Sequence, residues 1–216
     1  MRIRVNRRAR RIALRIDPVA GEPVLTLPRP SDLERGLDFL DRQSAWLARQ
    51  LAALPPGQPF VDGAELPYRG QPHRLRHAPG LKGRPRIVNG EILVGGAAEH
   101  LARRTREGLS REARDYIAPH AQVLAQRIGQ RIAGISIRDQ RTRWGSCGVN
   151  ARLNFSWRLV LAPPQALDYV VAHEVAHLAH HDHSDRFWAL VARLHPDYEA
   201  DRAWLRQHGP ALQRIG

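Results

Sequence analysis

The chain has 216 residues, of which 43% are apolar and 25% are charged, as in folded globular proteins. No run approaches the roughly 20 apolar residues that a membrane-spanning helix requires. The arginine-rich first 15 residues lack the apolar segment of a secretory signal. The chain has a single cysteine, Cys147, which excludes an intrachain disulfide. From these two features we expect a cytoplasmic location.

The net charge of +13 comes almost entirely from arginine, because Lys82 is the sole lysine. Such a charge can indicate a nucleic acid or another polyanion as a partner. It can also reflect a composition rich in Arg, Ala and Pro, with charges spread over solvated faces. The basic residues are scattered along the chain without a compact arginine block interleaved with aromatics, which favours the second interpretation.

The first part of the chain alternates short β-prone runs with turn-forming residues. Residues 12–16 and 24–27 flank such a turn, which predicts a hairpin. Residues 31–54 combine a capping-box pattern with leucines at helical spacing, which predicts one helix. Residues 60–96 predict further short strands. We therefore expect a β-rich region with one helix over residues 1–96.

The next part begins with a helix-forming composition over residues 97–128. Gly108 could interrupt this helix and Pro119 could kink it. Residues 132–137 and 153–159 alternate apolar and polar side chains, which predicts two strands.

A proline pair at the start of residues 163–180 opens another predicted helix, and two more are expected over 184–194 and 196–209. The prediction is an α+β fold in two parts. The β-rich region is followed by a domain over residues 97–216, in which a short antiparallel sheet lies beside the helix of residues 163–180.

That helix carries His173-Glu174-Val175-Ala176-His177, the HExxH pattern. Histidines at i and i+4 share one helix face, so both imidazoles can reach one tetrahedral metal ion. Glu174 would lie beside the metal, where a carboxylate can take a proton from an activated water. The pattern predicts a zinc-dependent hydrolase with one Zn²⁺ per chain, ligands His173 and His177, and Glu174 as general base.

A third ligand could come from His180, His181 or His183. On a continuing helix, His180 and His181 would lie a turn beyond the first pair, too far to complete the same tetrahedron. His183 can only be a ligand if the chain turns back. Asp182 favours a turn and Ser184 favours a helix start, so we prefer His183.

A longer pattern surrounds this motif and is dense from about residue 141 to residue 205. It consists of Arg143-Trp144-Gly145-Ser146-Cys147, Leu153-Asn154-Phe155-Ser156-Trp157-Arg158-Leu159, Asp168-Tyr169-Val170-Val171-Ala172 before the motif, His183-Ser184, Phe187-Trp188, Pro196-Asp197-Tyr198 and Trp204-Leu205. Together these segments resemble the YgjP-like metallopeptidase family, which is similar to SprT-type and minimal gluzincin proteases. The resemblance implies a zincin-like domain with His173, His177 and His183 as zinc ligands and Glu174 as catalytic base. That family usually has Asn before the third histidine, where this chain has Asp182.

Some neighbouring residues have two interpretations each. Arg143 and Trp144 could lie on an exposed edge strand that binds the substrate, or Trp144 could be a core residue and Arg143 a solvated one. Cys147 could be a reactive thiol or an inhibitory metal ligand, although a lone cysteine is more often a small buried hydrophobe. Tyr198 or His195 could polarise the substrate oxyanion.

The predicted reaction is hydrolysis of peptide bonds in a protein or peptide by a zinc-activated water. One alternative is metal-dependent hydrolysis of a nucleoside triphosphate, which the arginines favour. The chain lacks a GxxxxGK[ST] loop and a carboxylate cluster for magnesium, which argues against it. Another alternative is a nucleic-acid-associated protease or binding module.

Overall fold

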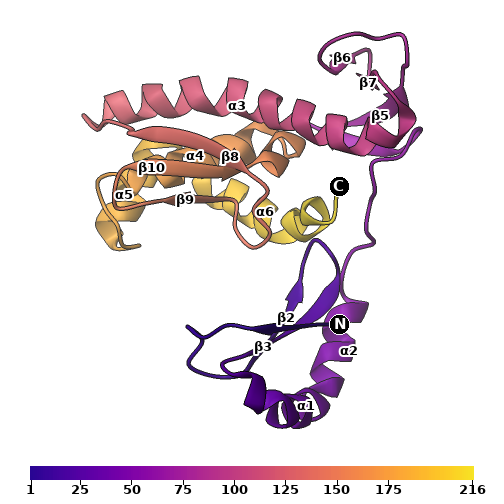
Figure 1. The fold of residues 1–216 in the computed structure, drawn as a ribbon. Helices are drawn as coiled ribbons and strands as arrows, with labels where there is room; N and C mark the ends of the chain where they lie inside the picture. Colours follow the sequence, from indigo (N-terminus) through magenta and orange to yellow (C-terminus); the bar gives the residue numbers. More distant parts are fainter. The chain divides into compact units, whose positions relative to one another are not determined.

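A computed structural model describes all residues from 1 to 216 and confirms an α+β fold (Figure 1). The chain divides into two compact units, residues 1–57 and residues 58–216. Each unit is described below by itself. No helix in either unit combines the length and apolarity that crossing a membrane requires.

The first unit is a three-stranded sheet followed by two helices. Its elements are β1 (Arg2–Val5), β2 (Ala13–Asp17), β3 (Glu22–Leu27), α1 (Leu33–Arg42) and α2 (Ser44–Ala52). β3 lies between the other two strands, parallel to β1 and antiparallel to β2, so the predicted hairpin is confirmed. The single helix expected over residues 31–54 is instead two helices that meet at Gln43.

A four-stranded sheet opens the second unit. It consists of β4 (Glu65–Tyr68), β5 (Gln71–His77), β6 (Arg86–Val88) and β7 (Glu91–Val94), in the order β4-β5-β7-β6. Leu66, Leu75 and Ile92 of this sheet are buried in the same core as the long helix that follows. For this reason the compact units divide after residue 57, whereas the change in composition had suggested a boundary at residue 96.

The long helix α3 (Leu101–Arg127) is uninterrupted. Gly108 does not break it. A Cβ at this position would lie 2.6 Å from Pro85 Cγ, so glycine leaves the room that Pro85 needs to pack against the helix. Pro119 also lies inside the helix. Leu109, Ile117 and other residues on one face are fully buried, and each large apolar side chain contributes roughly 1.5–3 kcal/mol to stability.

The sheet beside α3 consists of β8 (Gly134–Arg138), β9 (Gly145–Cys147) and β10 (Arg152–Ser156), in the order β8-β10-β9. It is mixed rather than purely antiparallel, because β10 pairs antiparallel to β9 and parallel to β8. β8, β9 and β10 run in alternating directions along the chain, so β8 and β10 point the same way. Because β10 lies in the middle of the sheet, it is hydrogen-bonded directly to β8, and this pair is parallel. This order leaves β9 at an edge.

Three helices complete the second unit: α4 (Pro164–Ala176), α5 (Asp185–Leu194) and α6 (Tyr198–Gln213). α4 contacts α3, α5, α6 and β9, and nine of its residues are buried (Figure 1). α4 ends at Ala176, shorter than the helix expected to reach about His180. His177 at the C-cap still has helical dihedral angles of −65° and −15°.

Candidate metal centre

Three histidine side chains converge at the end of α4. Ligand nitrogen atoms of His173, His177 and His183 all lie within 4.8 Å of one another. His173 Nε2 and His183 Nε2 are 3.2 Å apart. Two nitrogen ligands of a tetrahedral zinc ion, with bonds of about 2.0–2.1 Å, are separated by about 3.3–3.4 Å. The spacing of these nitrogens therefore fits a shared metal ion.

The third histidine reaches this position because the chain reverses after α4. Asp182 Oδ1 accepts hydrogen bonds from the backbone N–H and the hydroxyl of Ser184, at 3.3 Å and 2.8 Å. This local turn redirects the chain just before α5 begins at Asp185. His183 consequently lies beside the helix face that carries His173 and His177.

A backbone contact orients the His177 ring. Nδ1 of His177 lies 2.9 Å from the carbonyl oxygen of His180, so Nδ1 carries the proton and donates it. Nε2 is then left with a lone pair for a metal ion. Hydrogen bonds of this kind fix the tautomer and orientation of metal-binding histidines.

Burial favours the uncharged imidazoles that bind metals. It lowers the pKa of His173 to about 3, and the nearby His177 and His183 add to the effect. Burial also lowers the pKa of His177. Both side chains are therefore neutral near pH 7 and can coordinate a cation without first losing a proton.

Aromatic side chains from α5 hold the three imidazoles in place. The ring centroid of the buried Phe187 lies 4.9 Å from that of His173, 4.5 Å from that of His177 and 4.8 Å from that of His183. Trp188 stacks on His183 with a centroid distance of 5.7 Å. The sequence did not predict this role of Phe187 and Trp188, because their helical spacing indicates only that they belong to an apolar helix face.

Glu174 is 5% exposed and lies directly against the backbone of β9. A Cβ atom at Gly145 would be 2.5 Å from Glu174 Oε1 and 2.6 Å from its Cγ. Only glycine leaves room for this carboxylate. Burial raises the pKa of Glu174 to about 8, and the charge of Arg143 acts in the opposite direction.

The histidines and Glu174 line an open cleft of about 360 Å³. Its other lining residues are Arg143, Gly145, Ser146, Cys147 and His181. The sequence-predicted residues His173, Glu174, His177, His183 and Arg143 thus meet in one cleft.

Cys147 is half-buried, and its thiol contacts the backbone carbonyl of Gly148 at 3.6 Å. Burial, followed by the charge of Glu174, raises the pKa of the Cys147 thiol. The thiol is therefore poorly suited to forming a reactive thiolate.

Three other residues considered from the sequence do not line the cleft. Trp144 packs against the core beside Gly209. The hydroxyl of Tyr198 donates to Glu199 at 3.3 Å, and its ring stacks on Tyr169 and Trp188. His195 pairs with Asp201 at 2.6 Å.

In comparisons with known protein families, residues 10–208 match a family model described as YgjP-like, metallopeptidase domain. No curated protein and no solved structure gave a significant match.

The raised pKa of Glu174 predicts a specific pH dependence of stability for the metal-free protein. The folded state binds a proton at Glu174 up to about pH 8, whereas the ordinary value is 4.5. The folded state therefore holds more protons in this window, and Glu174 makes the free energy of unfolding decrease as pH rises through it. Glu174→Gln cannot ionise and lacks this contribution.

The test is urea denaturation of both metal-free proteins at pH 5.5 and 8.5. We expect the variant to gain on the order of 2–4 kcal/mol relative to the wild type between these pH values. Other titrating groups cancel in the difference. If the free energies of unfolding of the two proteins changed equally with pH, the raised pKa of Glu174 would be contradicted.

Proposed function

Because the chain belongs to the YgjP-like metallopeptidase family, we propose that it is a zinc-dependent peptidase with His173, His177 and His183 as ligands. The convergence of three histidine nitrogens within 4.8 Å carries this proposal. Catalytic zinc sites use three protein ligands and keep one position open for water or substrate. The open cleft beside these histidines provides access to that position.

Glu174 is the proposed general base. When bound, zinc supplies a Lewis acid that activates water and polarises a scissile carbonyl. Glu174 accepts a proton from the attacking water and transfers it to the leaving amine. The burial that raises its pKa makes the carboxylate a stronger base than an exposed glutamate. The pKa of about 8 already includes the charge of Arg143 and applies without a metal ion. A zinc ion held by the three histidines would lower this pKa and so favour the deprotonated carboxylate that a general base requires.

The edge strand β9 is the proposed binding surface for the peptide. Trp144 O and Gly148 N form hydrogen bonds with β10. Because backbone groups of successive residues in a strand point to opposite sides, those of Gly145 and Cys147 face the unpaired edge. All three residues of β9 line the cleft. An extended peptide could pair with this edge by β-augmentation.

Arg143 is the proposed substrate-binding cation. It lines the cleft, and its charge acts on Glu174. A guanidinium at this position suits a carbonyl or carboxylate oxygen of the substrate. Tyr198, which could polarise the substrate oxyanion, is not among the residues that line the cleft, so the proposal does not include it.

The residues that line the cleft favour a peptide substrate over a nucleoside triphosphate. Arg143 is the one arginine in the lining, whereas triphosphate sites surround the phosphates with several cations. An edge strand, in contrast, matches the repeating amide groups of a peptide. We therefore propose a protein or peptide substrate.

Zinc content distinguishes the proposed third ligand from its neighbour in the same cleft. His181 and His183 are both exposed histidines that line the cleft, but only His183 belongs to the converging group. We expect about one zinc per chain in the wild type and His181→Ala, and a strong loss in His183→Ala, because two ligands hold zinc weakly. Elemental analysis after dialysis measures this.

Full retention of zinc in His183→Ala, with loss of zinc in His181→Ala, would identify His181 rather than His183 as the third ligand. Absence of zinc from a folded wild type after zinc addition would remove the basis for the proposed function. Circular dichroism spectra of all three proteins establish that they are folded.

The contact between Gly145 and Glu174 predicts that Gly145→Ala impairs hydrolysis. The backbone of Gly145 is not in the left-handed region, so alanine can adopt it. The added Cβ would instead displace the carboxylate. We expect at least a tenfold lower rate on a fluorogenic casein substrate with normal zinc content, since general-base catalysis contributes about 10²–10⁴-fold.

Gly80→Ala is the matched control and should keep the activity, because Gly80 lies outside the cleft, a Cβ there meets no atom within 4 Å, and its backbone is not in the left-handed region. Equal rates for Gly145→Ala and the wild type would contradict the assigned position of Glu174. A parallel assay with a nucleoside triphosphate checks the substrate class.

A further inference from the structure

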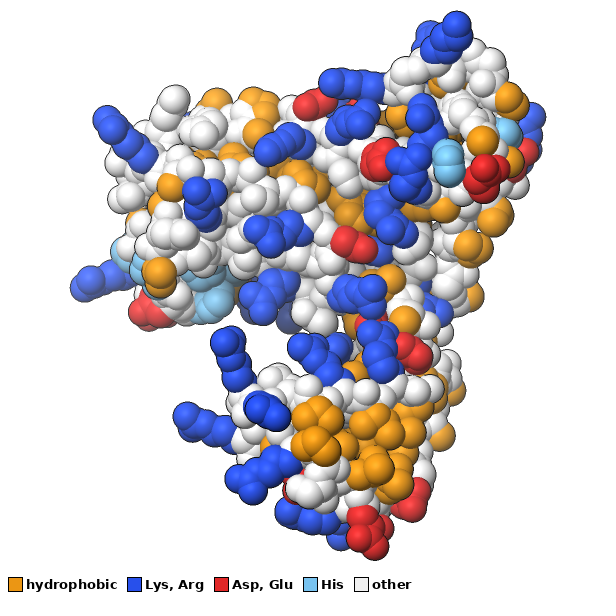
Figure 2. All heavy atoms as spheres, viewed as in Figure 1, with side chains coloured by type: hydrophobic (Ala, Val, Ile, Leu, Met, Phe, Trp, Pro, Cys, Tyr) orange, Lys and Arg blue, Asp and Glu red, His pale blue; other side chains and the backbone are white.

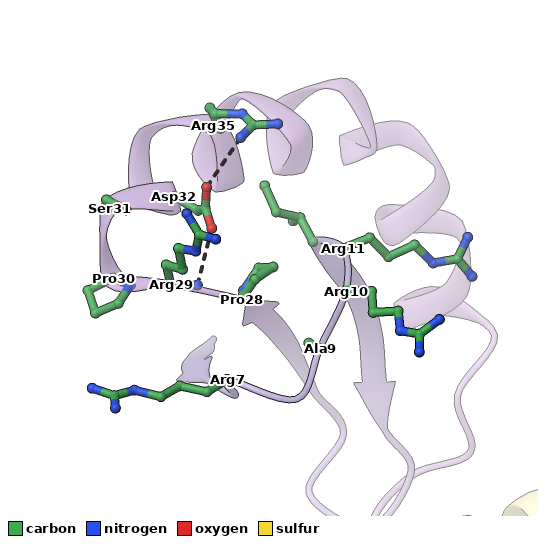
Figure 3. Close-up of a pocket in the computed structure, with 11 residues that line it drawn as sticks. Arg7, Ala9, Arg10, Arg11, Pro28, Arg29, Pro30, Ser31, Asp32 and Arg35 are labelled. Carbon is green, nitrogen blue, oxygen red and sulfur yellow. Dashed lines mark hydrogen bonds and ion pairs between the residues drawn. The ribbon is translucent and has the colours of Figure 1, made fainter.

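The first unit contains a basic hollow of about 970 Å³ outside the candidate metal centre. It lies between the loop that joins β1 to β2 and the segment that leads into α1 (Figure 3). Its charged lining residues are Arg7, Arg10, Arg11, Arg29, Arg35 and Asp32. All five arginines are exposed to solvent.

The single carboxylate in this basic hollow is already engaged. Asp32 accepts a hydrogen bond from the backbone N–H of Arg29 at 3.1 Å and forms an ion pair with Arg35 at 3.2 Å. The guanidinium groups of the other four arginines, Arg7, Arg10, Arg11 and Arg29, form no hydrogen bond or ion pair within the chain. Four positive charges thus remain without a protein counter-ion.

Arg7, Arg10 and Arg11 lie close together in the sequence, and the fold brings Arg29 and Arg35 to the same hollow. Residues 1–35 contain nine arginines and four acidic residues. Figure 2 shows Lys and Arg side chains gathered along one side of this part of the chain. Figure 3 shows Arg7 projecting to one side of the loop and Arg10 and Arg11 to the other. Like charges in one small unit repel one another, and a bound polyanion relieves that repulsion.

We propose that the basic hollow binds the phosphodiester backbone of a nucleic acid. The guanidinium group presents paired N–H donors that match phosphate oxygens. The four unpaired groups are exposed and spread over the hollow, which suits a repeating anion better than one small, enclosed ligand. Duplex DNA supplies one charge per about 1.7 Å of its axis.

The lining also predicts how the nucleic acid is recognised. No aromatic side chain lines the basic hollow, so base stacking on its wall is absent. Contacts to phosphates carry no sequence information by themselves. We therefore expect binding that is independent of sequence and strongly dependent on salt.

The test uses fluorescence anisotropy of a labelled 20-base-pair DNA of mixed sequence with the full chain. The hollow variant replaces Arg7, Arg10, Arg11 and Arg29 with Gln. The control variant replaces four exposed arginines outside the hollow, Arg42, Arg49, Arg127 and Arg131, with Gln and has the same net charge. We expect the hollow variant to bind at least about tenfold more weakly and the slope of log K against log salt to become shallower by about 3–4.

The control variant should keep a slope close to that of the wild type. Equal losses in both variants would show that net charge alone attracts the DNA and would overturn the proposal, as would a wild type that does not bind. Poly-glutamate that competes as well as unlabelled DNA would assign the hollow to an acidic protein instead. The result of the DNA-binding experiment does not bear on the proposed peptidase function, which zinc content and the hydrolysis assay test separately.

Discussion

The burial of α4 is the constraint on which the candidate site depends. This helix is enclosed by α3, α5, α6 and β9, so its side chains have little freedom to move. Enclosure fixes His173 and His177 one turn apart on the same face, and desolvation keeps them uncharged. The same burial presses Glu174 against Gly145 of β9. One packing arrangement therefore sets both the proposed ligands and the proposed base.

The two ends of α4 contribute differently to the site. The first turns of α4 belong to the apolar core, whereas its C-terminal end lines the cleft. At that end, the turn at Asp182 and Ser184 places His183 beside His173 and His177. Phe187 of α5 then contacts all three imidazoles. A rigid apolar support of this kind holds ligands close to the geometry that a metal requires, so less ordering is needed on binding.

Local features of the site could be predicted from the sequence, because helix geometry and turn chemistry act over a few residues. The spacing of His173 and His177 and the turn at Asp182 are of this kind. Contacts between distant segments could not be predicted. Gly145 lies 29 residues before Glu174, and only the fold brings the two together. The parallel β8–β10 pair likewise depends on tertiary packing. Arg7, Arg10 and Arg11 already lie close together in the sequence, but only the fold brings Arg29 and Arg35 to the same hollow.

The coordination of zinc is the most direct test of the central claim. X-ray absorption at the zinc edge of the zinc-loaded protein measures ligand type and distance. Three histidines predict nitrogen or oxygen neighbours at about 2.0–2.1 Å, with the outer-shell scattering of three imidazoles. A sulfur neighbour at about 2.3 Å would instead identify Cys147 as a ligand and contradict the three-histidine site. Scattering from fewer than three imidazoles would contradict it as well.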